Sequence, residues 1–338
     1  MTKPPYTITS TALNLVAAIC EKLALLSAAG SLSSGPLSPQ LRRENRIRTI
    51  HASLAIENNT LSLEQVTDII DGKPVLGPPR DIQEVRGAVA AYEKLDAWTP
   101  HSLNDLLAAH ALLMHDLVRA PGKLRTGGVR VARHTPPPAI RVHGLLENLL
   151  LWLQTTDEHP LIASCVFHYE FEFIHPFEDG NGRMGRLWQT LLLSKWKPVL
   201  AYIPVETIIR NRQEAYYASL GQADAQGEAT AFVEFILTAL HETLDSPSLL
   251  VQGNDQVNVQ VSGQVIKLLL AFGGRERSAA ELMQALALRH MPSFRKSTLT
   301  PALEAGLVER TQPDSPRSPT QRYRLTAKGR QVLQSSDL

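Results

Sequence analysis

Apolar residues recur along most of the chain at the three- and four-residue spacing of amphipathic helices. The clearest helix is expected from Leu161 to Ile174, where apolar side chains return every fourth residue, at Leu161, Cys165, Tyr169 and Phe173. Pro176 ends it, because proline disfavours helical backbone at the preceding residue. A second helix is expected from about Arg183, leaving a short turn between the two.

The same spacing predicts further helices over residues 41–57, 63–70, 82–98, 103–117 and 142–154, with one or two more in residues 1–30. Only Val129, Arg130 and Val131 alternate in the manner of a strand in this part of the chain. The expected fold class is therefore mainly α, with a helical core over about residues 40–245.

The pattern changes after residue 245. Residues 246–262 are polar and read as a linker, and helices are expected over 264–272, 279–286 and 293–305. Short strands follow at 307–310 and 321–325, with a last helix after Thr326. Three helices and a two-stranded wing resemble a winged helix-turn-helix. The expected domains are 1–100, 101–245 and 263–338, joined by the linker.

Composition narrows the class of protein. A formal net charge of +1 over 338 residues gives no global signal for nucleic acid or membrane, and 43% hydrophobic residues suffice for a core. Cys20 and Cys165 are too few and too distant for a disulfide framework or a zinc site. Glu21 and Lys22 interrupt the apolar stretch 12–29, which excludes a membrane span. We expect a cytoplasmic protein.

The turn between the two central helices carries the chemistry. It reads His175-Pro-Phe-Glu-Asp179-Gly-Asn-Gly182-Arg183-Met-Gly-Arg186. Glycines at a helix N-terminus let backbone N–H groups turn toward an anion. Arg183 and Arg186 are three residues apart on one helical face and can clamp phosphate oxygens. Asp179 is a hard ligand suited to Mg²⁺, and the imidazole of His175 is the natural general base.

This stretch resembles the Fic motif, His-x-Phe-x-(Asp/Glu)-Gly-Asn-Gly-Arg-x-x-Arg, at every defined position. Fic proteins transfer a nucleotide monophosphate, usually AMP from ATP, to a protein hydroxyl. The phosphorylating Doc type has a lysine where this chain has Gly182, so the resemblance favours AMP transfer.

The resemblance also implies roles for the residues of the motif. His175 would take the proton of the attacking Tyr, Thr or Ser hydroxyl, and Asp179 would hold Mg²⁺. The residues implied to bind the phosphates of ATP are Gly180, Asn181, Gly182, Arg183 and Arg186. Phe177 would anchor the turn in the core.

Two further segments are similar to parts of Fic proteins. Residues 121–131, followed by three prolines, resemble the flap, a short β-hairpin whose edge at Val129, Arg130 and Val131 would pair with a target segment. The segment that begins Asn211-Arg-Gln-Glu resembles the lining of the adenine pocket, which would place Asn211, Tyr216 and Tyr217 there.

Ser53-Leu-Ala-Ile-Glu57-Asn58 resembles the inhibitory motif of the self-inhibited class, in which an N-terminal helix carries the inhibitory glutamate. Glu57 would form a bidentate pair with Arg186 and keep it from the γ-phosphate. ATP would then bind in a skewed pose, and loss of in-line geometry is costly. The same glutamate also fits an alternative activity, the removal of AMP from modified proteins.

The C-terminal region suggests a second class of function. Residues 261–338 hold 12 Lys+Arg against 6 Asp+Glu, so a DNA-binding regulator that uses the Fic core as a sensor is the alternative to an enzyme. Its expected DNA contacts are Arg295, Lys296 and Arg322. Winged helices also bind proteins or dimerise. Self-modification, homo-oligomerisation and transfer of another nucleotide stay open, and the target protein cannot be read from the sequence.

Overall fold

The computed structural model describes residues 3–29, 37–129, 131, 134–246, 263–272, 275–286, 288, 290–304, 306–312, 321–326 and 329. The chain divides into two compact units, one of residues 1–252 and another of residues 253–338. Most of the expected linker, 247–262, lies outside the described residues, as does the expected helix after Thr326 apart from residue 329.

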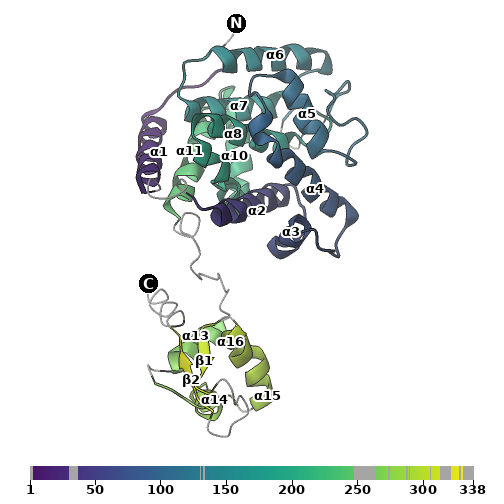
Figure 1. Cartoon of the computed structure of the whole chain (residues 1–338). Coiled ribbons are helices and arrows are strands. Elements are labelled where there is room, and N and C mark those ends of the chain that lie inside the picture. Colours follow the sequence, from purple (N-terminus) through teal and green to yellow (C-terminus); the bar gives the residue numbers. More distant parts are fainter. Residues whose placement is uncertain are drawn as a thin grey trace. The chain divides into compact units, whose positions relative to one another are not determined.

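The first unit is helical, as its apolar pattern predicts (Figure 1). Its helices are α1 (Ser10–Ala29), α2 (Pro39–Ile56), α3 (Leu63–Ile70), α4 (Pro79–Glu93), η2 (Leu95–Ala97), α5 (Leu103–Leu113), α6 (Ala139–Thr155), α7 (Pro160–Ile174), α8 (Asn181–Trp196), η3 (Pro198–Tyr202), α9 (Val205–Asn211), α10 (Gln213–Gln226) and α11 (Thr230–Asp245). The helix expected at 63–70 has the predicted bounds, whereas that expected at 103–117 ends at Leu113.

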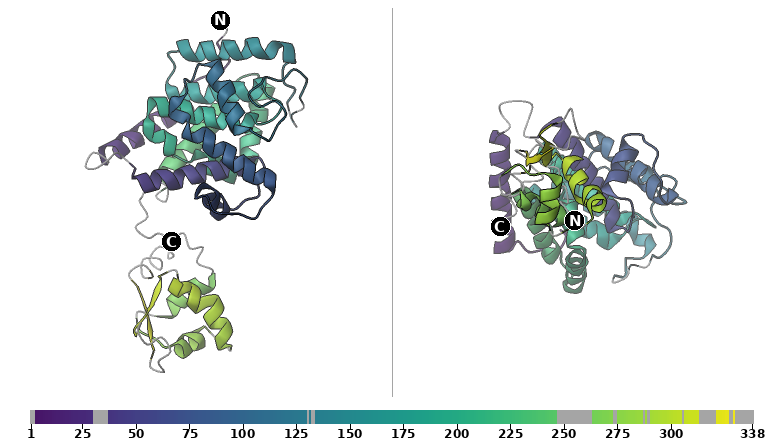
Figure 2. Two further views of the ribbon diagram at one scale, coloured as in Figure 1. Left: turned by 45° about the vertical axis from the view of Figure 1, so that its right-hand side comes forward. Right: turned by 90° about the horizontal axis from the view of Figure 1, so that it is seen from below.

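Helices α7 and α8 lie at the centre of this unit, with α6 on one side and α2 on the other (Figures 1 and 2). Their central place explains their composition: Phe167, Phe171, Leu187 and Trp188 are fully buried. The two helices pack directly on each other. A turn between two buried helices is held rigidly at both ends, which suits it to carry a site.

The second unit combines short helices with a two-stranded sheet. Its elements are α13 (Gly263–Ala271), α14 (Ala279–Ala285), α15 (Met291–Phe294), η4 (Arg295–Leu299), α16 (Thr300–Glu304), β1 (Val308–Arg310) and β2 (Tyr323–Leu325). The strands pair antiparallel, with Val308 opposite Leu325. Phe272, Leu282 and Phe294 form part of its own core. Helices followed by a β-hairpin are the order that the sequence predicts.

Candidate active site

His175 ends α7 in an unusual backbone conformation. Its φ of 50° places it in the left-handed region, while its N–H still donates to the carbonyl of Phe171 at 2.9 Å. Few residues other than glycine adopt this conformation, so the surroundings must enforce it. The strain turns the chain sharply out of the helix and into the glycine turn.

Arg125 supplies part of that enforcement. Its buried guanidinium donates to the carbonyl oxygens of His175 at 2.7 Å, of Ile174 at 3.3 Å and of Pro137 at 2.5 Å. The backbone N–H of Arg125 donates to the carbonyl of Pro176 at 2.9 Å. A cation at a helix C-terminus satisfies carbonyls that have no partner within the helix. Arg125 therefore fixes the backbone that carries the imidazole.

The imidazole of His175 is neutral near pH 7. Burial lowers its pKa to about 4, although a hydrogen bond to the backbone of Glu172 acts in the opposite direction. Burial disfavours the charged form of a histidine. A neutral ring held by one hydrogen bond to a carbonyl keeps its other nitrogen able to accept a proton.

The turn after His175 is braced by its own side chains. Asn181 accepts the N–H of Phe177 and donates to its carbonyl, both at 2.9 Å. Phe177 is fully buried and stacks on His110, with ring centroids 3.6 Å apart. His110 accepts the N–H of Gly122 at 2.8 Å, so its other nitrogen, 3.0 Å from the carbonyl of Asp179, is the donor.

Two glycines of the turn lie close to the side chains of neighbouring residues. Gly180 has a φ of 86°, and a Cβ there would lie 2.6 Å from the sulfur of Met114. A Cβ on Gly182 would lie 2.3 Å from Oε1 of Glu57 and 3.1 Å from Nη1 of Arg186. Any side chain at 182 would therefore collide with the carboxylate that reaches this arginine.

Arg186 is 1% exposed and is held by the end of α2. Its Nε donates to Ser53 Oγ at 2.9 Å, and its Nη2 donates to the carbonyl of Ser53 at 3.0 Å and to Glu57 Oε1 at 2.7 Å. Burial alone would lower its pKa, but Glu57 raises it above the ordinary value. The contact with Glu57 uses one carboxylate oxygen, so the expected bidentate geometry is wrong.

Arg183 binds two other carboxylates, those of Glu84 and Asp179. Its Nη1 donates to Glu84 Oε1 at 3.0 Å and its Nη2 to Asp179 Oδ1 at 3.1 Å. Asp179 also accepts from Arg80 at 3.1 Å and from the N–H of Gly180 at 2.6 Å. The side chain of Asp179 is 44% exposed, so it remains accessible to solutes.

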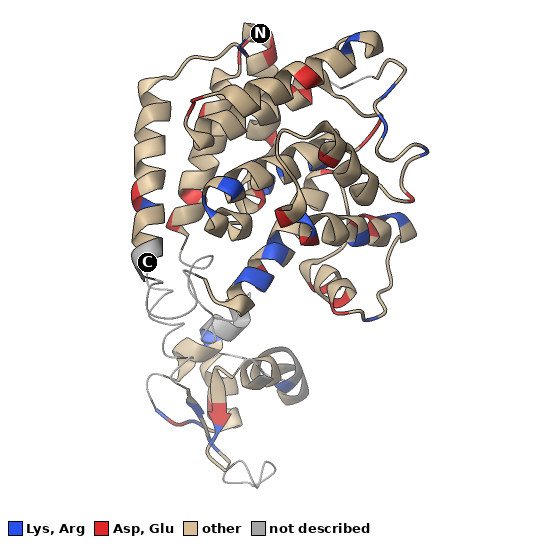
Figure 3. Ribbon diagram, turned by 45° about the horizontal axis from the view of Figure 1, so that its top comes forward, with Lys and Arg blue, Asp and Glu red and all other residues tan. Residues whose placement is uncertain are grey.

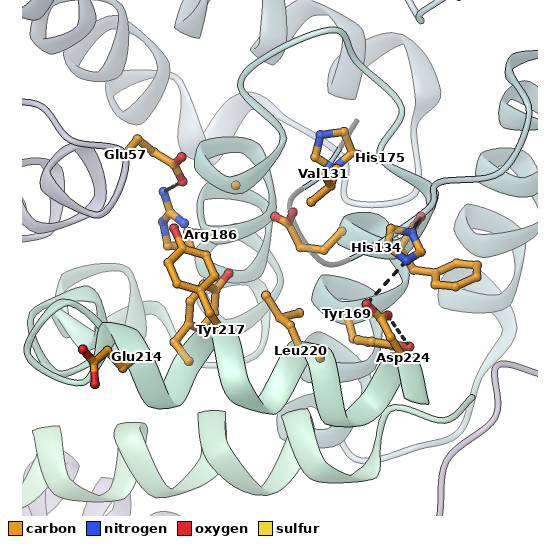
Figure 4. A pocket seen from close by; sticks show the side chains of 15 residues that line it. Glu57, Val131, His134, Tyr169, His175, Arg186, Glu214, Tyr217, Leu220 and Asp224 are labelled. Atoms are coloured by element: carbon orange, nitrogen blue, oxygen red, sulfur yellow. Dashed lines mark hydrogen bonds and ion pairs between the residues drawn. The ribbon is translucent and has the colours of Figure 1, made fainter. Parts of the chain in front are cut away.

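A cavity of about 590 Å³ lies beside the turn (Figure 4). Its lining is Glu57, Val131, His134, Tyr169, Glu172, Phe173, His175, Gly182, Arg186, Glu214, Tyr216, Tyr217, Leu220, Gly221 and Asp224. Of the residues expected from the sequence, His175, Gly182, Arg186 and Glu57 meet here. Tyr216, Tyr217 and Val131 line the same space.

Other residues expected at the site do not line this cavity: Ser53, Asp179, Gly180, Asn181, Arg183 and Asn211. Asn181 uses its side-chain oxygen and one N–H of its side-chain amide on Phe177, and its expected contact with phosphate stays a prediction. Asn211 is exposed at the end of α9, and its expected place in an adenine pocket stays a prediction.

Polar groups at the other side of the cavity were not predicted from the sequence. Tyr169 donates its hydroxyl to Asp224 Oδ1 at 3.0 Å, and His134 Nδ1 lies 3.4 Å from Oδ2 (Figure 4). Burial raises the pKa of Glu172 to about 8. These side chains come from α7, α10 and the residues after the flap. The helical spacing of Tyr169 and Glu172 relative to His175 was the only signal that could have indicated them.

The flap is smaller than a full hairpin among the described residues. Val131 and His134 form a single antiparallel bridge, and Val129 lies outside any strand. Arg130, the middle of the expected docking edge, is outside the described residues. His134 also hydrogen-bonds to the carbonyl of Phe173 at 2.8 Å, which attaches this segment to α7.

In the second unit, acidic residues accompany the expected DNA contacts (Figure 3). Arg322 pairs with Glu281 at 3.0 Å, and its neighbour Arg324 pairs with Glu309 at 2.6 Å. Arg295 is exposed, and the side chain of Lys296 lies outside the described residues. Paired arginines are less available to phosphate than free ones, so the DNA contact stays a prediction.

Metal clusters and membrane spans are both absent from the part of the chain that the structure describes. Within it, no group of three or more His, Cys, Asp or Glu side chains is placed to hold a metal ion. No described helix has the length and apolarity needed to cross a bilayer.

Two family models match the chain. Residues 100–193 match the Fic/DOC family, and residues 263–326 match the C-terminal domain of the filamentation induced by cAMP protein Fic-like family. The first match contains the turn between α7 and α8. The second covers the helices and strands of the second unit.

Curated and solved relatives agree with these matches. A protein adenylyltransferase Fic of Aedes aegypti is 31% identical over 60% of this chain and 42% of its own length, and protein adenylyltransferase fic-1 of Caenorhabditis elegans is 33% identical over 58% and 40%. The chain thus spans less than half of these curated relatives. A crystal structure of a Fic family protein from Desulfovibrio desulfuricans G20 is 58% identical over 97% of this chain and 99% of that one, with a TM-score of 0.70.

Proposed function

The chain belongs to the Fic family, and we propose that its first unit transfers AMP from ATP to a hydroxyl group of a protein. In this reaction the hydroxyl oxygen of a Tyr, Thr or Ser attacks the α-phosphorus. A new P–O bond forms, the bond from the α-phosphorus to the bridging oxygen breaks, and pyrophosphate leaves. His175 accepts the hydroxyl proton.

One observation carries this proposal. Nη1 of Arg186 is buried next to Gly182 and has no hydrogen-bond partner within the described residues, and Arg186, Gly182 and His175 all line the same cavity. A buried N–H without a partner is costly, and a phosphate oxygen would satisfy it. The neutral imidazole in the same cavity supplies the base for a displacement at phosphorus.

The remaining phosphate contacts would come from the start of α8. Backbone N–H groups at Gly182 and Arg183 belong to the helix N-terminus, where negative charge is favoured. Nε of Arg183, which has no partner among the described residues, gives this arginine a free donor as well. Gly180 and Asn181 shape the turn, and the second N–H of the Asn181 side-chain amide would be its donor to a phosphate oxygen.

Asp179 is the residue that fits Mg²⁺. Its half-exposed carboxylate stands at the start of α8, and Mg²⁺ in nucleotide sites is commonly held by one or two carboxylates together with the phosphates. When bound, the ion neutralises charge on the phosphates. Asp179 would exchange its contacts with Arg80 and Arg183 for the metal, and both arginines would then be available to other anions.

Glu57 is proposed to restrain this activity. It occupies Nη2 of Arg186, the arginine that the γ-phosphate would need. Its carboxylate also fills the space next to Gly182. A triphosphate can enter in full only if Glu57 withdraws, and otherwise the α-phosphorus is not aligned for in-line attack.

The protein substrate would lie along the flap. Val131 lines the cavity and pairs with His134, so an extended target segment could add to the neighbouring backbone and present its hydroxyl to His175. Pairing through backbone atoms imposes little side-chain selectivity. This arrangement also allows the chain to modify itself.

Intact-mass spectrometry with ATP and Mg²⁺ tests the reaction. We expect Glu57→Gly to gain an AMP adduct that wild type lacks or shows weakly, and Glu57→Gly/His175→Ala to gain none. Parallel release of pyrophosphate would be measured so that poor self-modification is not mistaken for inactivity. Absence of both signals in Glu57→Gly, with its unfolding transition intact, would reject AMP transfer.

The same variants separate the alternatives. Replacing ATP by GTP, CTP or UTP reports the nucleotide that the site accepts. Incubating the AMP-modified protein with wild type reports removal of AMP, the reverse activity in which Glu57 would orient water. Loss of the adduct with wild type, but not with Glu57→Gly, would assign that activity to Glu57.

A further inference from the structure

Arg183, the second arginine proposed to bind phosphate, also forms an ion pair with a carboxylate from the N-terminal region. Arg183 donates to Glu84 at 3.0 Å, and both side chains are at least nine-tenths buried. Glu84 belongs to α4, whereas Glu57, which holds Arg186, follows α2. Two neighbouring arginines on one face of α8 are thus held by two different N-terminal segments.

Asn59 connects these two segments. Its side-chain amide donates to Glu84 Oε2 at 2.9 Å and to the carbonyl of Asp81 at 3.1 Å, and its side-chain oxygen accepts the N–H of Leu61 at 3.2 Å. Its own backbone N–H donates to the carbonyl of Leu54 in the last turn of α2. Asn59 therefore attaches the end of α2, which carries Glu57, to the carboxylate that holds Arg183.

Both carboxylate oxygens of Glu84 are engaged in this network. Oε1 accepts from Arg183 and lies 3.5 Å from Nε of Arg80, while Oε2 accepts from Asn59. A buried carboxylate is stable only while its donors remain in place. Movement of Arg183 toward a phosphate would therefore remove a partner from Glu84 and weaken its hold on Asn59.

We propose that Glu84 is a positioning residue that couples the two arginines. While Glu84 binds both Arg183 and Asn59, Glu57 stays bound to Arg186. When Arg183 turns to a nucleoside polyphosphate, Glu84 releases Asn59, and the end of α2 can then move Glu57 away from Arg186. This inference rests on the proposed function, because it takes Arg183 as a phosphate ligand. The restraint at Glu57 is then sensitive to occupancy of a second arginine rather than fixed.

The direct test is Asn59→Ala, which removes the donor to Glu84 and leaves the side-chain contacts of both arginines in place. Glu84→Gln leaves one acceptor oxygen for two donors, so it weakens the contact with either Asn59 or Arg183. Glu93→Gln, an exposed glutamate on the same helix α4, is the matched control. AMP transfer would be measured for each variant, alone and combined with Glu57→Gly, after tryptophan fluorescence has verified folding.

The combination with Glu57→Gly separates coupling from a general structural effect. We expect Asn59→Ala to raise AMP transfer by about fivefold or more, the lower part of the usual range of coupling between sites. In the Glu57→Gly background it should add nothing, since no carboxylate remains to be released. An equal loss in both backgrounds would overturn the proposal, as would an unchanged rate in the wild-type background.

Hydrogen exchange gives a readout that does not need catalysis. Amides of residues 54–61 should exchange faster in Asn59→Ala and Glu84→Gln than in Glu93→Gln, with no nucleotide present. In His175→Ala, addition of ATP and Mg²⁺ should accelerate the same amides. If Glu57→Gly shows no AMP transfer, the proposed function fails while this measurement still tests the coupling, and unchanged exchange in both variants would reject it.

Discussion

Arg186 in the first unit and Arg324 in the second make ion pairs of nearly the same length. The contact from Arg186 to Glu57 is 2.7 Å and that from Arg324 to Glu309 is 2.6 Å. Their surroundings differ: the side chain of Arg186 is 1% exposed and that of Arg324 is 54% exposed. Similar distances therefore conceal different energetics, because the guanidinium of Arg186 is shielded from water while that of Arg324 is solvated.

The difference separates a ligand site from a surface contact. A buried arginine keeps N–H groups that water cannot reach, as at Nη1 of Arg186 and Nε of Arg183, which have no partner among the described residues. An exposed arginine satisfies such groups with solvent at no cost. An arginine therefore indicates phosphate binding when the fold buries it beside a cavity. An arginine on an exposed hairpin that also carries glutamates is much weaker evidence for phosphate binding.

Removing each arginine in turn should give the largest contrast. We expect Arg186→Ala to lower the free energy of unfolding by about 3 kcal/mol, because it empties the space of a fully buried side chain and removes the donors to Ser53. Arg324→Ala should leave the free energy of unfolding almost unchanged, as for other exposed pairs. Denaturant unfolding would be followed by circular dichroism for both units and by tryptophan fluorescence for the first, which contains all four tryptophans. Equal losses would invalidate the comparison.

Arg125 tests whether a buried arginine outside the motif also matters for the chemistry. Arg125→Lys keeps the charge but loses the planar set of donors that fixes the carbonyls of Ile174 and His175. We expect AMP transfer in the Glu57→Gly background to fall about 100-fold, the cost of misplacing a reacting group. ATP affinity, measured by calorimetry, should change little. A loss confined to affinity would show that Arg125 acts on binding instead.

Part of this site could be predicted from the sequence. The spacing of His175, Gly182 and Arg186 within one helix–turn–helix segment limits how far apart they can lie, and the structure brings them to one cavity. The mainly helical fold was confirmed for the same reason, since helical periodicity is a local property. The bracing role of Asn181, whose side chain binds the backbone of Phe177, was not part of the prediction, and its phosphate contact stays a prediction.

The supporting residues could not be predicted, because their partners are distant in the chain. Arg125 binds the carbonyl of a residue 50 positions away, and Glu84 binds an arginine 99 positions away. A single arginine in a loop or a single glutamate on a helix looks like any exposed charge. Only the tertiary structure, which brings the loop of Arg125 to the end of α7 and Glu84 of α4 to α8, makes these side chains part of the site.

Burial of a histidine should also make the stability of the first unit depend on pH. Burial lowers the pKa of His168 to about 3, while its usual value is 6.5. Below pH 6.5 the unfolded chain binds a proton that the folded chain does not, so the contribution of His168 to stability falls as pH decreases, by about 1.4 kcal/mol per pH unit. Glu172 and Glu206, with raised pKa values, titrate in the opposite sense.

Because other buried groups titrate in the opposite sense, the contribution of His168 must be measured as a difference in stability between wild type and a variant. We expect the free energy of unfolding of wild type minus that of His168→Gln to decrease by about 2 kcal/mol between pH 6.5 and 5. Gln keeps a donor for Gln189 and an acceptor for Tyr216, which are the partners of His168. A difference that does not vary with pH would mean that His168 is protonated in the folded protein.

The smallest expected effect concerns the exposed pair of the second unit. If Glu281 neutralises Arg322, Glu281→Gln should strengthen binding of duplex DNA a few-fold, with a steeper dependence on salt by about one counterion. Gel mobility shifts from about 50 to 200 mM salt would measure both quantities, and Arg322→Ala in the same background should cancel the gain. An unchanged shift in Glu281→Gln would mean that this hairpin does not face phosphate, and Arg295 would remain the contact to test.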